Sequence, residues 1–80
     1  MTGIVTFVRG ERVAVETRLG FTFFEVLGSC DLEPGDEVRG ALDALGSEAL
    51  RLTSTGEELD VFIEDIYASR DSAAHFVRGR

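Results

Sequence analysis

The sequence predicts an all-β fold, a five- to six-stranded antiparallel barrel followed by a short C-terminal helix. Short stretches rich in Val, Ile, Phe and Thr recur along the chain. Turn-forming residues, mostly glycines, separate these stretches at intervals of about 8–12 residues, which is typical of barrels and sandwiches. The 80 residues, 44% of them hydrophobic, leave room for one core. We therefore expect a single domain over residues 1–80, in which residues 56–80 form a C-terminal extension.

The first three expected strands form a meander. Residues 3–8 carry β-branched and aromatic side chains without helical spacing. Residues 12–18 alternate, so that Val13 and Val15 share one face of the strand. Residues 21–27 hold Phe or Val at four of seven positions. Glycines between these segments predict tight turns.

Two further strands are expected after a longer break. The pair Pro34-Gly35 is typical of a turn with proline second and glycine third. Residues 37–43 then alternate between apolar and polar or small side chains, and residues 47–53 contain three apolar positions. A turn around Gly46 separates these two strands.

The segment 59–66 has two possible interpretations. Leu59, Val61 and Ile63 alternate with acidic residues, as in a strand, although a helical stripe can also be drawn through the segment. The Val-Phe-Ile run favours the strand. We expect a helix over residues 71–78 with Asp71 as its N-cap, and fraying at Gly79 and Arg80.

The charge balance limits the classes of partner. Fifteen acidic residues oppose eight basic ones, all of them Arg, and the net charge is −7. Such a surface repels polyanions, whereas phosphate backbones draw their binding energy from clustered Lys and Arg. The balance therefore argues against tight, non-specific nucleic-acid binding, but it leaves room for a local Arg patch.

The sequence predicts neither a catalytic centre, nor a metal site, nor a cofactor. His75 and Cys30 are the only His and Cys, and no nucleophile–base pair or metal-ligand spacing is recognisable. A single cysteine also excludes an intrachain disulfide, which fits a reducing compartment. Because no nucleophile–base pair is recognisable, we expect that the protein is not an enzyme. Because the sequence has no signal-peptide pattern and no long apolar run, we expect a cytoplasmic location.

Three short motifs occur in order between residues 3 and 53: Gly3-x-Val5-x-Phe7-Val8, then Leu32-Glu33-x-Gly35-Asp36-x-Val38, then Gly46 followed by Ala49 and Leu52-Thr53. These motifs resemble the first strand, the approach to the fourth strand and the last strand of cold-shock domains. The resemblance implies an OB-like barrel.

Cold-shock domains stack single-stranded nucleic acid on exposed aromatic side chains. The resemblance places Phe7 at the family's Trp and Phe23 at one of its stacking Phe residues. Val13 and Val15 stand where the family has two further stacking Phe residues. This departure forfeits most of the stacking energy at these positions, which is roughly 1–3 kcal/mol per base. The site implied by the resemblance, with its nearby arginines, comprises Phe7, Arg9, Arg12, Val13, Val15, Phe23 and Arg51.

The sequence thus predicts a non-enzymatic binding module and leaves its ligand open. One candidate is single-stranded RNA or DNA, bound weakly through the site just named. The other is a protein or a second copy, bound through the apolar sheet face or through Phe76 and Val77 on the C-terminal helix. The acidic residues between 57 and 65 could form a docking face for a basic partner, but we interpret them as a solvated surface.

Overall fold

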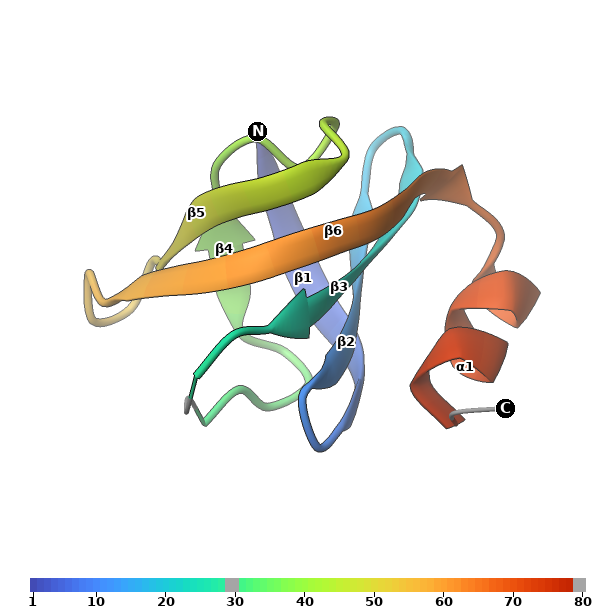
Figure 1. The fold of residues 1–80 in the computed structure, drawn as a ribbon, viewed down its shortest axis with the longest axis horizontal. Helices are drawn as coiled ribbons and strands as arrows, with labels where there is room; N and C mark the ends of the chain where they lie inside the picture. The colour runs from blue at the N-terminus through green and yellow to red at the C-terminus, as the bar shows by residue number, and fades with distance from the viewer. Residues whose placement is uncertain (29–30, 79–80) are drawn as a thin grey trace.

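The computed structural model describes residues 1–28 and 31–78, and within them six strands close into an antiparallel barrel (Figure 1). The strands follow the order β1-β2-β3-β6-β5-β4, and β4 pairs with β1 to close the barrel. This architecture confirms the predicted fold class. The elements are β1 (Thr2–Arg9), β2 (Arg12–Thr17), β3 (Gly20–Val26), β4 (Glu37–Arg39), β5 (Gly46–Leu52), β6 (Glu58–Ala68) and α1 (Arg70–Arg78).

The barrel interior is the main hydrophobic core. Strand alternation directs one set of side chains inward from every strand, among them Val5, Val15, Phe24 and Ile63, each at most 1% exposed. Gly3 allows β1 to approach β2 closely, because a β-carbon at this position would overlap the side chain of Val15.

A second core lies outside the barrel, between α1 and the outer face of β1, β2 and β3. Its buried residues are Ala14, Phe21 and Phe23 from the sheet and Ala73 and Val77 from the helix. This part of the sheet is therefore buried on both faces. That arrangement explains why the run from residue 21 to residue 24 is buried without interruption.

The ambiguous segment is a strand, because β6 runs from Glu58 to Ala68. The C-terminal helix is confirmed, but the prediction of Asp71 as its cap is wrong. Ser69 caps α1: its Oγ accepts a hydrogen bond from the Ser72 N–H at 3.1 Å, and its carbonyl accepts one from Ala73 at 2.9 Å. Asp71 lies in the first turn, where its negative charge interacts favourably with the positive end of the helix dipole.

The fourth strand is shorter than predicted, because it ends at Arg39 rather than at residue 43. Gly40 has a φ of +148°, and its N–H donates to the Met1 carbonyl at 2.9 Å, so the chain leaves the ladder there. The turn at Pro34-Gly35 is present: Gly35 has a φ of +102°, and the N–H of Asp36 donates to the Glu33 carbonyl. The predictions for Cys30, Gly79 and Arg80 lie outside the described residues.

Candidate functional site

The sheet face that the resemblance assigns to nucleic acid is covered by α1. Figure 1 shows the helix beside the barrel, next to β1, β2 and β3. The Phe23 side chain is only 6% exposed, and its ring stacks on Phe76 with a centroid distance of 5.0 Å and an angle of 12°. Phe7 is half-buried and stacks against Phe21 with a centroid distance of 6.2 Å. The structure therefore brings Phe7 and Phe23 to one face, but a helix of the same chain occupies that face.

Arginines attach the helix to this face. The guanidinium of Arg12 lies 4.7 Å from the centroid of the Phe76 ring, and its Nη1 donates to the Phe76 carbonyl at 2.9 Å. Arg70 lies over the rings of Phe7 and Phe21, at 5.7 and 5.4 Å from their centroids. Both arginines stack in the geometry of cation–π contacts. Arg12 thus contributes to the docking of α1 rather than pointing to solvent.

Val13 and Val15 do not belong to an outer binding surface. They are 1% and 0% exposed and lie in the barrel interior. Strand alternation makes their side chains point away from Ala14 and from the face that α1 covers. Assigning these two valines to the nucleic-acid site is therefore wrong, since a ligand outside the barrel does not reach them.

Phe76 and Val77 do not form a free interaction surface either. Val77 is 6% exposed and packs in the second core, and Phe76 is half-buried between Phe23 and Arg12. Their role is to hold α1 against the barrel. Both side chains are engaged within the chain, and their binding of another protein stays a prediction.

The remaining arginines of the predicted site are far apart. Arg9 is exposed at the end of β1, opposite Arg12 in the β1–β2 register. Arg51 is on β5, which lies three strands from β2 in either direction around the barrel. The predicted nucleic-acid residues are thus divided between two walls and the interior.

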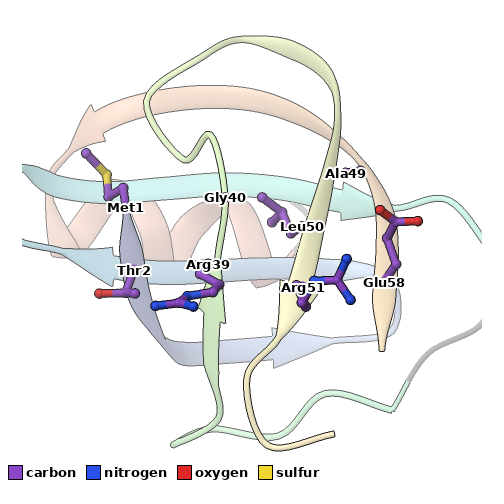
Figure 2. A pocket seen from close by; sticks show the side chains of 8 residues that line it. All are labelled: Met1, Thr2, Arg39, Gly40, Ala49, Leu50, Arg51 and Glu58. Carbon is purple, nitrogen blue, oxygen red and sulfur yellow. The ribbon is translucent and has the colours of Figure 1, made fainter. Parts of the chain in front are cut away.

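Arg51 borders a hollow of about 370 Å³ on its own wall (Figure 2). It is paired in register with Arg39 on β4 and with Glu58 on β6, and its Nη1 donates to the Gly56 carbonyl at 2.7 Å. Figure 2 shows the Arg51 side chain extending toward Glu58 and that of Arg39 extending toward Thr2. The two guanidinium groups therefore diverge, and a carboxylate also lines the hollow, so this arrangement does not form a converging anion site.

The opposite wall, formed by β3, β6 and β5, carries exposed apolar side chains. Phe62 lies near the middle of β6 and is 44% exposed, opposite Glu25 on β3 and Ser47 on β5. Leu27 is 51% exposed, and its N–H donates to the Asp60 carbonyl at 2.8 Å. Of its three strands, β3 also packs against α1, whereas β5 and β6 are not among the strands that the helix mainly contacts. In Figure 1, β5 and β6 cross the front of the barrel and the helix lies to the side.

A shallow hollow of about 450 Å³ lies beside Phe62, along β5 and β6. Its lining residues are Leu27, Ser47, Glu48, Ala49, Asp60 and Val61. We define the Phe62 face as Phe62 and this hollow, together with the flanking carboxylates of Glu25 and Glu64. It combines an exposed aromatic ring, a recess of mixed apolar and acidic lining, and an acidic border.

The sequence pattern indicated the acidic part of this surface, between residues 57 and 65, but it was interpreted as solvated, and Phe62 was not predicted as a site residue. The signal was nevertheless present in the strand interpretation of 59–66. If Leu59, Val61 and Ile63 point into the barrel, Phe62 must point outward with Asp60 and Glu64. Phe62 is thus a large aromatic side chain whose neighbours in the outward row, Asp60 and Glu64, are both acidic.

Among residues 1–28 and 31–78, no three His, Cys, Asp or Glu side chains gather in a way that could hold a metal ion. The same residues contain no helix with the length and hydrophobicity required to span a bilayer. Comparisons with protein-family models, with curated proteins and with solved structures gave no match.

Proposed function

We propose that this chain is a non-enzymatic protein-binding module that uses the Phe62 face. The observation that carries the proposal is Phe62 itself, a large ring 44% exposed near the middle of a strand and next to a hollow lined by both apolar and acidic residues. Aromatic side chains at the centre of a surface, bordered by polar groups, are typical anchors of protein–protein interfaces. A side chain of the partner would enter the hollow between Leu27 and Ala49.

Nucleic-acid binding is the weaker candidate for two physical reasons. Phe23 and Arg12, which would stack a base and hold a phosphate, are engaged with Phe76 of α1. A nucleic acid would therefore have to displace the helix. The net charge of −7 adds long-range repulsion between the protein and a phosphate backbone.

A photo-crosslinking amino acid at position 62 tests the proposal. We expect benzoylphenylalanine at this position to capture one discrete polypeptide in cells that produce the protein. The matched control places the same group at Leu19, which is similarly exposed, at 45%, in the turn before β3. The Phe62→Ser variant should lose the captured partner on co-purification, whereas Leu19→Ser should retain it.

The structure makes this substitution a clean test. Phe62 points outward and is not part of either core, so Phe62→Ser leaves the barrel interior intact. A far-ultraviolet circular dichroism spectrum and a thermal midpoint close to those of the unmodified protein are expected. Equal capture from positions 62 and 19, or crosslinks to nucleic acid only, would contradict the proposal.

A further inference from the structure

We infer that the partner of the Phe62 face presents a basic segment, in which Lys or Arg side chains flank one large apolar side chain. This inference rests on the proposed function and names the chemistry of the partner. Phe62, together with Leu27 and Ala49 in the hollow beside it, determines where an apolar side chain would bind, while Glu48 and Asp60 line the same hollow. The charges around Phe62 and the hollow determine which charged groups the partner carries beside that apolar side chain.

Carboxylates border Phe62 on three sides. Glu25 lies directly across from it on β3, Asp60 precedes it by two residues on β6, and Glu64 follows it by two. Glu48 lines the hollow as a fourth acidic residue. Within the part of the chain that the structure describes, the sole ion pair joins Arg70 to Glu16, so none of these four carboxylates is paired with a cation.

The geometry of the strand sets the spacing of the complementary charges. Asp60 and Glu64 are four residues apart, which corresponds to at most about 13 Å along a strand, and the ladder with β3 shifts its register at Glu64. β6 is hydrogen-bonded to β3 on one side and to β5 on the other, so it has no free edge for an added strand. The partner therefore docks across the face with its side chains, as an extended segment with cations two residues before and two residues after the apolar anchor.

The same charges disfavour two other occupants. A second copy would bring an identical acidic border against the first, and like charges in an interface are repulsive. A nucleic acid would bring phosphates against the carboxylates. A basic segment is the partner that neutralises the border while its apolar side chain covers Phe62.

Peptide titrations followed by ¹⁵N–¹H correlation spectra test the inference on the complete chain. The probes are Ac-Gly-Arg-Ser-Leu-Ser-Arg-Gly-NH₂ and two analogues in which both Arg are replaced by Gln or by Glu. We expect the Arg peptide to shift the amides of Leu27, Ala49 and Phe62, and to bind about three- to tenfold more tightly than the Gln peptide at low salt. The Glu peptide should cause no shifts, and the advantage of the Arg peptide should shrink as the salt concentration rises.

Paired charge variants provide the matched control. The double variant Asp60→Asn with Glu64→Gln should abolish the advantage of the Arg peptide. Glu33→Gln with Asp43→Asn removes the same net charge from exposed positions in two loops and should preserve that advantage.

The outcomes separate this inference from the proposed function. Equal binding of the Arg and Gln peptides at the Phe62 face would overturn the basic partner and leave the binding face standing. Shifts confined to other surfaces would also overturn the inference, and the crosslinking experiment would then decide the proposed function independently. Binding of a short single-stranded DNA at these amides would contradict both.

Discussion

At the scale of single residues, the face that each side chain takes on its strand decides its role. In β2, Val13 and Val15 fill the barrel, while Ala14 between them supports α1 from outside. A one-residue change of register would exchange these two environments. The small Ala14 side chain leaves space on the outer face for the helix, and the branched valines suit the interior.

Thr22 is a polar residue on the inward face of β3, so its hydroxyl group is buried. It is 2% exposed, and its hydroxyl donates to the Leu42 carbonyl at 2.7 Å, which ties β3 to the turn after β4. We predict that Thr22→Val lowers the free energy of unfolding by about 1–3 kcal/mol, because a buried carbonyl loses its donor while the shape of the side chain is kept. Urea denaturation measures this loss.

Thr53→Val is the control for this prediction, since Thr53 is exposed in the turn after β5. Its effect should stay within about 0.5 kcal/mol. A loss for Thr22→Val no larger than that of the control would mean that the Thr22–Leu42 hydrogen bond does not stabilise the fold.

At the scale of elements, α1 depends on the barrel for its stability. A helix of nine residues is marginal in water, so its docking on the outer face of β1, β2 and β3 is what keeps it folded. Phe76 is the central contact, because its ring stacks on Phe23 and lies beneath Arg12.

We predict that Phe76→Ala undocks α1. The loss of the aromatic stack and of the cation–π contact should lower the free energy of unfolding by about 2 kcal/mol, which is less than for a fully buried Phe. Hydrogen exchange should show a larger loss of protection in the amides of residues 73–78 than in those of β5 and β6. His75→Ala, at an exposed position of the same helix, should leave the protection of α1 nearly unchanged.

The secondary-structure elements could be predicted from the sequence, but the contacts between α1 and the barrel could not. Period-two alternation and glycine turns are local signals that located the strands, and the apolar residues Ala73, Ala74, Phe76 and Val77 located the helix. The packing of Phe76 on Phe23 joins residues more than 50 positions apart, and no local pattern reports it. The motifs therefore placed Phe23 on an open face that is in fact covered. The early end of β4 likewise depends on the contact between Gly40 and Met1.

At the scale of the whole molecule, the barrel has walls of different character. One wall is occupied by α1, and the wall that carries Phe62 presents an aromatic ring within an acidic border. The carboxylates repel one another, because 15 acidic residues outnumber 8 basic ones. Among the described residues, one ion pair forms, and it is exposed, with an N–O distance of 3.9 Å. Salt therefore weakens many repulsive interactions between charges and few attractive ones.

This balance predicts that moderate salt stabilises the fold. Between about 10 and 200 mM NaCl, where the Debye length falls well below the size of the molecule, the free energy of unfolding should rise by roughly 0.5–1 kcal/mol. Urea denaturation at several salt concentrations measures this slope. In the variant Glu33→Gln with Asp43→Asn, the net charge is −7 + 2 = −5 and the slope should be shallower. A fall in stability with salt would contradict the prediction, because it would require favourable charge pairs to outweigh the repulsion among the carboxylates.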